Sequence, residues 1–398
     1  MDRVELEAWL RLTLTPGVGN DSVRRLLAAF GLPQAIFEQP AVALRQLLTS
    51  AQASALAQPP ETLAAQLQAT LNWMNEAPDG AARRVVTLGD AAYPAALLTI
   101  EDPPCLLYAL GQVPGGISAP DPAQTGAQTA PIASESIADG WPVRALALVG
   151  SRNPTPQGAQ NARQFARALA SGGVTVVSGL ALGIDGAAHE GALEGAPAGT
   201  LATIAVIGTG IDRVYPRQHR ELAHRIATRG VIVSEYPLGT PPLPPNFPRR
   251  NRLIAALSQG TLVVEAALQS GSLITARLAV EQGKEVFAIP GSIHSPQSRG
   301  CHALIRQGAK LVETAQDVLE ELSLAPTGAA AGPHGADAAA DPEDEVLAAL
   351  GFDPVSLDAL VARTGIAPSA LQARLLEHEL AGLVARLPGG LFQRVDAA

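Results

Sequence analysis

The chain has 398 residues, of which 47% are apolar and 16% are charged, and its formal net charge is −9. This length predicts two or three domains, and no uncharged apolar run is long enough to span a membrane. The N-terminal text MDRVELEAWL lacks the charged-then-apolar order of a signal peptide, so we expect a cytoplasmic protein. Cys105 and Cys301 are the only cysteines, which argues against a disulfide framework and against a structural zinc site.

Charge is distributed unevenly along the chain. Residues 141–320 have 17 basic and 12 acidic side chains, a net charge of +5. Residues 1–140 (7 basic, 14 acidic) and residues 321–398 (4 basic, 11 acidic) each carry −7, so the three parts sum to −9. The basic middle favours a polyanionic partner, although the same excess is also compatible with ordinary solvated surface.

Two stretches read as linkers, because they are rich in Gly, Pro, Ala and Ser and have no hydrophobic periodicity. They are a flexible insert at 111–140 and a linker at 325–342. We therefore predict a helical domain over 1–80, a central domain over 85–324 and a small domain over 343–398.

The first part alternates helical patterns with a turn, Pro16-Gly17-Val18-Gly19. It resembles a SAM-like or helix-hairpin-helix-like domain, and Asn20 or Asp21 is predicted to cap the helix that follows the turn. A glycine turn of this kind can bind a phosphate through backbone N–H groups. The surrounding negative charge favours a purely structural turn instead.

The central part alternates apolar runs with helical patterns. Because the runs are uniformly apolar, we expect strands that are buried on both faces of a Rossmann-like, doubly wound, mostly parallel sheet. In such a sheet, ligands bind outside the carboxyl ends of the strands. The predicted strands are 145–151, 174–180, 203–210, 231–236, 261–267, 285–291 and 309–312.

The last part, from about residue 343, reads as three short helices and a hairpin that turns at Pro388-Gly389-Gly390. This order predicts an α/β protein that ends in a winged-helix-like domain. Its recognition helix, PSALQARLLEHEL, carries Arg374 against Glu377 and Glu379 and is too acidic for a typical DNA major-groove helix. We expect it to contact protein rather than DNA.

Glycine and small hydroxyl residues follow nearly every predicted strand. Glycine lets a backbone approach a ligand closely, and exposed N–H groups at a helix start bind anions. Together these segments predict a phosphate-binding crevice, although each alone is also ordinary turn chemistry. The segments are Gly150-Ser151-Arg152, Ser178-Gly179, Gly208 with Gly210, and Ser270-Gly271-Ser272.

The stretch NFPRRNRLIAAL, residues 246–257, places cations where a helix begins. Cations at a helix N-terminus oppose the helix dipole, so Arg249 and Arg252 cost stability unless an anion lies nearby. Asn251 adds an amide that can hydrogen-bond a phosphate or a base edge. Phe247 and Tyr215 can stack on bases, although Phe247 is equally suited to a hydrophobic staple.

The same segments lack the complete motif of an enzyme. The dinucleotide fingerprint is broken after Gly210, and neither a Walker A motif nor a nucleophile elbow is present. Asp185 and His189 are interpreted as a structural hydrogen-bonded pair that anchors the glycine loop. Glu265 is interpreted as a partner for an arginine. We therefore expect no catalytic residue, metal or cofactor.

The central text resembles the DprA/Smf family (DNA-processing protein A). The matching segments are LVGSR, SGLALGIDGAAH, VIGTGIDRVYP, SEYPLG, FPRRNRLIAALSQGTLVVEAALQSGSLITA, VFAIPGS and GCHALIRQGAKLV, which together span roughly residues 85 to 320. The resemblance implies a homodimeric, non-enzymatic protein that binds single-stranded DNA, protects incoming DNA and loads RecA recombinase during natural transformation.

The resemblance also implies a DNA pocket formed by Gly150, Ser151 and Arg152, by Arg249, Asn251 and Arg252, and by the Ser270–Ser272 turn. Basic residues after Tyr215-Pro216 complete it. The family pattern YPxxN followed by a basic residue is altered here, so either Arg217 or Arg220 takes that role. The alternative function from the residues alone is a Rossmann-like nucleotide-processing enzyme of the phosphoribohydrolase type, with Glu265 acting on the sugar.

Overall fold

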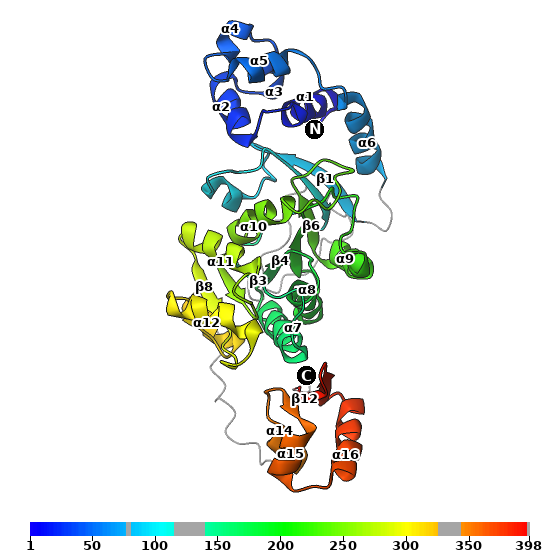
Figure 1. Ribbon diagram of the computed structural model, residues 1–398. Coiled ribbons are helices and arrows are strands. Elements are labelled where there is room, and N and C mark those ends of the chain that lie inside the picture. Colours follow the sequence, from blue (N-terminus) through cyan, green and yellow to red (C-terminus); the bar gives the residue numbers. More distant parts are fainter. Residues whose placement is uncertain (77–80, 115–139, 325–343, 396–398) are drawn as a thin grey trace, which may run out of the picture.

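The computed structural model describes residues 1–76, 81–114, 140–324 and 344–395 (Figure 1). Most of the predicted insert at 111–140 and the whole of the predicted linker at 325–342 lie outside these residues, so neither prediction is tested.

Helices form the N-terminal part, from residue 3 to residue 75. Leu6, Leu10 and Leu26 are buried between them, because these residues repeat at helical spacing on the inner faces of the first two helices. The helices are α1 (Arg3–Leu14), α2 (Asn20–Phe30), α3 (Pro33–Phe37), α4 (Ala41–Leu44), α5 (Ser50–Ala57) and α6 (Leu63–Asn75).

The turn between α1 and α2 has Gly17 at φ 78°, a left-handed conformation that favours glycine. The predicted capping residues for α2 were wrong. Gly19 is the N-cap and has no side chain that could cap the helix, and the amide of Asn20 instead donates to Asp102 Oδ2 at 3.3 Å.

Nine strands of the described residues form one sheet, in the order β1-β2-β6-β5-β4-β3-β7-β8-β9. The seven predicted strands, β3 to β9, are confirmed and run parallel to one another. The sequence analysis missed β1 and β2, an antiparallel hairpin that pairs with β6. The strands are β1 (Ala82–Thr87), β2 (Leu106–Gly111), β3 (Ala145–Val149), β4 (Thr175–Ser178), β5 (Thr203–Val206), β6 (Val231–Ser234), β7 (Gly260–Val263), β8 (Glu285–Ala288) and β9 (Lys310–Leu311).

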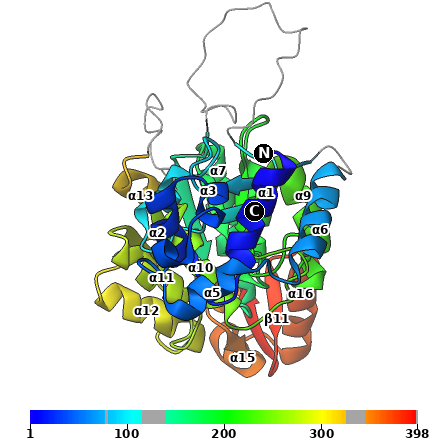
Figure 2. The ribbon, with the colours of Figure 1, turned by 90° about the horizontal axis from the view of Figure 1, so that it is seen from above.

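Helices cover both faces of the sheet, which confirms the doubly wound prediction (Figure 2). Leu146 and Leu148 of β3 point to one face, whereas Ala147 and Val149 point to the other, because side chains alternate along a strand. The first face packs against α7 (Pro156–Ser171), α8 (Ile184–Gly195), α9 (Arg220–Arg229) and α13 (Ala315–Glu321). The second packs against α10 (Asn246–Ala256), α11 (Ser272–Glu281) and α12 (Arg299–Arg306).

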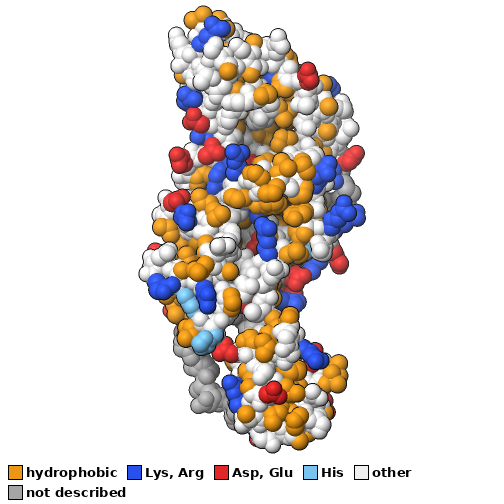
Figure 3. Space-filling view, viewed as in Figure 1, with side chains coloured by type: hydrophobic (Ala, Val, Ile, Leu, Met, Phe, Trp, Pro, Cys, Tyr) orange, Lys and Arg blue, Asp and Glu red, His pale blue; other side chains and the backbone are white. Residues whose placement is uncertain are grey.

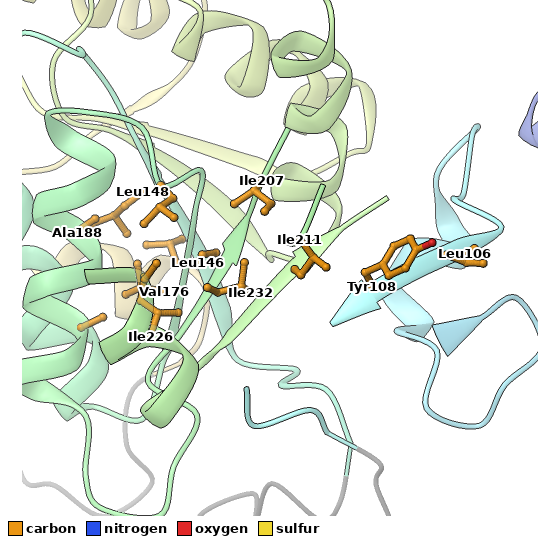
Figure 4. Close-up of a cluster of buried hydrophobic side chains, with 14 of the residues drawn as sticks. Leu106, Tyr108, Leu146, Leu148, Val176, Ala188, Ile207, Ile211, Ile226 and Ile232 are labelled. Carbon is orange, nitrogen blue, oxygen red and sulfur yellow. The ribbon is translucent and has the colours of Figure 1, made fainter. Parts of the chain in front are cut away.

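The hydrophobic cluster of the first face extends to Leu106 and Tyr108 of β2 (Figure 4). The same cluster includes buried residues of the N-terminal helices. Tyr108 of β2 makes the connection, since its ring lies edge-on to Trp73 of α6 with centroids 5.8 Å apart. The N-terminal helices and the sheet therefore share one apolar core.

The order in which successive strands are added to the sheet reverses between β3 and β7. The strands β4, β5 and β6 follow on one side of β3, and β7, β8 and β9 lie on its other side. Such a topological switch point opens a crevice at the carboxyl ends of the two central strands.

The C-terminal part has the helices and hairpin of a winged helix, as predicted, and a separate apolar cluster around Leu350, Leu360 and Leu371. Its hairpin turns at Gly389 and Gly390, both with positive φ. The elements are α14 (Glu345–Leu350), β10 (Val355–Ser356), α15 (Leu357–Thr364), α16 (Pro368–Leu380), β11 (Val384–Leu387) and β12 (Leu391–Arg394).

Candidate nucleic-acid interface

A pocket of about 470 Å³ lies at the switch point between β3 and β7. The loop after β3, the loop after β7 and the start of α10 form its walls. Eight of the predicted site residues line it: Gly150, Ser151, Arg152, Phe247, Asn251, Ser270, Gly271 and Ser272. The structure therefore brings together segments that are up to 122 positions apart, the difference between 272 and 150.

The loop after β3 lies close to its neighbours because of its glycine. A Cβ at Gly150 would lie 2.6 Å from Ile184 Cγ1 and 2.9 Å from the carbonyl oxygen of Glu265. Ser151 beside it accepts a hydrogen bond from the Asn153 N–H at 3.1 Å through its hydroxyl. The loop is thereby fixed, and Arg152 is exposed at the rim of the pocket.

A cation and two aromatic rings lie in a row beside the pocket: Arg152, Phe247 and Tyr215. The Arg152 guanidinium lies 5.6 Å from the centroid of the Phe247 ring, and the Phe247 ring lies 5.6 Å from that of Tyr215. Tyr215 is 45% exposed and lines a second pocket of about 650 Å³ together with Arg217. A cation beside exposed rings is the usual platform for the bases and phosphates of a single strand.

The loop after β7 is tied to α10 by Asn251. The Asn251 amide donates to the Gly271 carbonyl at 3.3 Å, and its side-chain oxygen accepts from Arg250 Nε at 3.1 Å. The hydroxyls of Ser270 and Ser272 are 2.7 Å apart, so they are mutually hydrogen-bonded at the start of α11.

Arg250, which the sequence analysis did not select, holds the glycine loops behind the pocket. Its side chain is 4% exposed and donates from Nη1 to the carbonyl oxygens of Gly179, at 2.6 Å, and Val206. Gly179 is required here because a Cβ at this position would come within 2.5 Å of the guanidinium. Burial lowers the pKa of Arg250 to about 10, so the group remains charged at neutral pH.

Asp185 holds the same loop from the other side. Its Oδ2 accepts hydrogen bonds from the N–H groups of Gly179, at 3.1 Å, and Ala181, at 3.3 Å. The expected Asp185–His189 pair is wrong, since His189 Nδ1 instead contacts Thr203 Oγ1 at 2.8 Å. Asp185 therefore anchors the glycine loop without His189.

Arg252 lies in a network of ion pairs. Its guanidinium contacts Glu235 at 2.6 Å and Asp102 at 3.3 Å, and Asp102 also contacts Arg24 of α2 at 2.9 Å. Burial alone would lower the pKa of Arg252, but the Glu235 carboxylate raises it. Its charge is therefore already compensated, and direct contact of Arg252 with DNA stays a prediction.

The remaining predicted residues lie around the pocket and do not line it. Ser178 is fully buried and donates to the Leu148 carbonyl at 2.6 Å. Gly208 and Gly210 are buried at the end of β5, where the Gly208 carbonyl accepts from Asn246 at 3.1 Å. Arg217, Arg220 and Arg249 are exposed. On the face of the molecule that Figure 3 draws, Lys and Arg side chains are spread among apolar ones rather than gathered into one patch.

Glu265 has a partner other than the one expected. Its two carboxylate oxygens accept from the N–H of Thr155 at 2.9 Å and from the Thr155 hydroxyl at 2.6 Å. Among the described residues no arginine pairs with it, so the expected arginine partner is wrong. Glu265 thus binds Thr155, the N-cap residue of α7, and does not line the pocket.

Sequence comparison places the chain among known proteins. Protein Smf of Escherichia coli (strain K12) is 39% identical over 397 residues, which is 97% of this chain and 95% of that protein. The chain belongs to the DprA/Smf family.

Other DprA/Smf comparisons agree. The DNA recombination-mediator protein A family matches residues 138–323, and the DprA winged helix domain matches residues 329–390. The X-ray structure of DNA processing protein A (DprA) from Streptococcus pneumoniae superposes with a TM-score of 0.60 and 32% identity, over 81% of this chain and 98% of that chain. DNA processing protein DprA of Bacillus subtilis (strain 168) is 38% identical over 237 residues, 60% of this chain and 70% of that protein.

The pocket of this DprA/Smf chain also contains residues that sequence reasoning missed. Gln297 lines it and donates to the Asn153 carbonyl at 3.2 Å, which connects the segment before α12 to the loop after β3. No motif marks Gln297, because it lies in a short 3-10 helix (Pro296–Ser298) after β8 and has neither glycine nor a charged residue directly next to it. Arg250 did carry a signal, since it belongs to the same arginine cluster as Arg249 and Arg252.

Proposed function

We propose that this chain binds single-stranded DNA along the carboxyl edge of its sheet and acts in DNA processing. The observation that carries the proposal is the pocket at the β3–β7 switch point, with Arg152 at its rim and the Phe247 and Tyr215 rings beside it. Relatives named DNA processing protein DprA, and the family description of a recombination mediator, support a nucleic-acid ligand.

A preference for single strands follows from the rings. Phe247 and Tyr215 can stack only on bases whose faces are free, and the bases of a duplex are already stacked on one another. Because phosphate contacts dominate such binding, affinity should fall with salt at a log–log slope of about −0.7 for each phosphate neutralised. Little sequence preference is expected.

We further propose that the chain is not an enzyme. Both carboxylates near the loops are committed to backbone or hydroxyl donors: Asp185 to Gly179 and Ala181, and Glu265 to Thr155. Of the described residues that line the pocket, Asp185 alone is acidic. A phosphoribohydrolase of the alternative type needs a free carboxylate beside the sugar, which this arrangement does not offer.

The cellular role is proposed from the family resemblance. We infer that this chain protects incoming DNA in the cytoplasm during natural transformation, loads RecA recombinase onto it, and works as a homodimer. Among the described residues no helix is long and apolar enough to cross a membrane.

Fluorescence anisotropy with labelled single- and double-stranded oligonucleotides over a salt series tests the proposal. We expect tighter, salt-dependent binding of the single strand. Arg152→Gln should weaken it, whereas Arg45→Gln, which removes another exposed arginine, from the N-terminal helices, should not. Equal affinity for both oligonucleotides, together with release of free base from nucleoside monophosphates, would favour the phosphoribohydrolase.

A further inference from the structure

Arg250 is a buried arginine, and some of its N–H donors have no acceptor among the described residues. Its side chain is 4% exposed, Nη1 donates to the carbonyls of Gly179 and Val206, and Nε donates to Asn251 Oδ1. No described residue accepts a hydrogen bond from Nη2. A guanidinium has five N–H donors in a fixed plane, so the remaining donors of Arg250 have no protein partner among these residues.

The Nη2 group of Arg250 is accessible from the pocket. Arg250 is one of the residues that line it, and Nη2 is not among the fully buried, unsatisfied side-chain atoms. A charge-assisted hydrogen bond from arginine to a phosphate is among the strongest in proteins, and Nη2 is accessible to such an acceptor from the pocket. An anion in the pocket would supply the missing acceptor.

The charges around the pocket also favour an anion. Arg250 and Arg152 are the two cations that line it, and Asp185 is the single acid among the described lining residues. No carboxylate lies within ion-pair distance of Arg250 in the described part of the chain, in contrast to Arg252, which contacts two. The Asp185 carboxylate, which lies beyond ion-pair distance, still favours the charged form of Arg250, but no carboxylate contacts its guanidinium directly.

We propose that Arg250 is the buried phosphate-binding residue of the pocket, where its Nη2 donates to one phosphodiester of the bound strand, and that Arg252 has a structural role only. This assignment rests on the proposed single-strand binding and adds the position of one phosphate. Arg152 at the rim then contacts the same phosphate or the next one, and Phe247 stacks on the adjoining base.

A purely structural role for Arg250 makes different predictions. If Arg250 only tied Gly179 to Val206, its replacement would lower stability and would leave the salt dependence of DNA binding unchanged. If it binds a phosphate, the salt slope itself must fall, because one fewer phosphate is neutralised. The slope therefore separates the two roles.

The experiment measures binding of a labelled oligothymidylate to the full chain by anisotropy over a salt series. Arg250→Gln should weaken binding by at least about tenfold, the value of one charge-assisted hydrogen bond, and should reduce the slope by about 0.7. Arg45→Gln, which removes an exposed arginine of the N-terminal helices, is the matched control and should keep the affinity and the slope of the unmodified chain. Circular dichroism and thermal melting establish that each variant is folded.

Arg250→Lys covers the case in which Arg250→Gln does not fold. Lysine keeps the charge and removes the planar second donor, so we expect a retained slope with an affinity at least about fivefold lower. Unchanged affinity in every folded Arg250 variant would overturn the assignment of Arg250. Absence of single-strand binding by the unmodified chain would instead reject the proposed function, so the two failures are distinguishable.

Discussion

Replacement of Arg252 is expected to act on stability before it acts on binding. The Arg252 side chain is 15% exposed and that of Glu235 is 11% exposed, with the two charged groups 2.6 Å apart. Arg252→Ala would leave the Glu235 carboxylate buried without its main partner. Removing one partner of a buried pair typically costs about 3–5 kcal/mol. Because Asp102, the second partner, is 48% exposed and gains water on release, we expect the lower end, about 3 kcal/mol.

Urea denaturation followed by tryptophan fluorescence measures this loss. The double replacement Arg252→Met with Glu235→Leu should recover most of it, to within about 1 kcal/mol of the unmodified chain, because apolar side chains of similar volume can replace a buried ion pair. Arg249→Ala is the matched control, since Arg249 is exposed and should change stability by less than about 0.5 kcal/mol. If Arg252→Ala matched that control, or the double replacement were as unstable as the single one, the buried-pair argument would be refuted.

Three further predictions concern pH, stacking and the C-terminal domain. Burial lowers the pKa of His189 to about 3 in the folded chain, whereas the unfolded chain takes up a proton near pH 6.5. The free energy of unfolding should therefore fall by about 2 kcal/mol between pH 7 and pH 5. Urea titrations at both pH values check this, and His189→Gln should remove that loss. Phe247→Ala should weaken binding of an oligothymidylate by about 1–3 kcal/mol, and should weaken binding of an abasic oligonucleotide much less. Fluorescence anisotropy measures both affinities, and equal losses would exclude stacking. A chain that ends at residue 342 loses 4 basic and 8 acidic residues, a net −4, and should bind the single strand at least as tightly as the whole chain, since the winged helix has its own apolar cluster. Weaker binding would show that the winged helix contacts the strand.

The parallel strands could be predicted because each is a short, uniformly apolar run followed by glycine. The hairpin β1–β2 could not be predicted in the same way. ARRVVT carries two adjacent arginines after its first residue, and LLYALG is an apolar run too short to distinguish a strand from a buried helix. The pairing of β2 with β6 is a long-range choice, made by residues more than a hundred positions later in the chain.

The location of the site was predictable, and the separate tasks of its arginines were not. Successive helical residues point about 100° apart, so Arg249, Arg250 and Arg252 face solvent, the loops and Glu235 respectively. Which direction is inward depends on how α10 packs on the sheet. The sequence shows three similar charges, and only the fold distinguishes an exposed cation, a buried donor and a paired one.

The β2 strand has a consequence for how the chain can be divided. The family match to the central domain begins at residue 138, yet β6 forms its outer ladder with residues 108–111. A fragment that starts at 138 would present the backbone N–H and C=O groups of β6 as an open edge beside an uncovered apolar core. Open edges of this kind template intermolecular β-pairing. We expect such a fragment to aggregate, and the N-terminal hairpin to serve as protection against self-association through that edge.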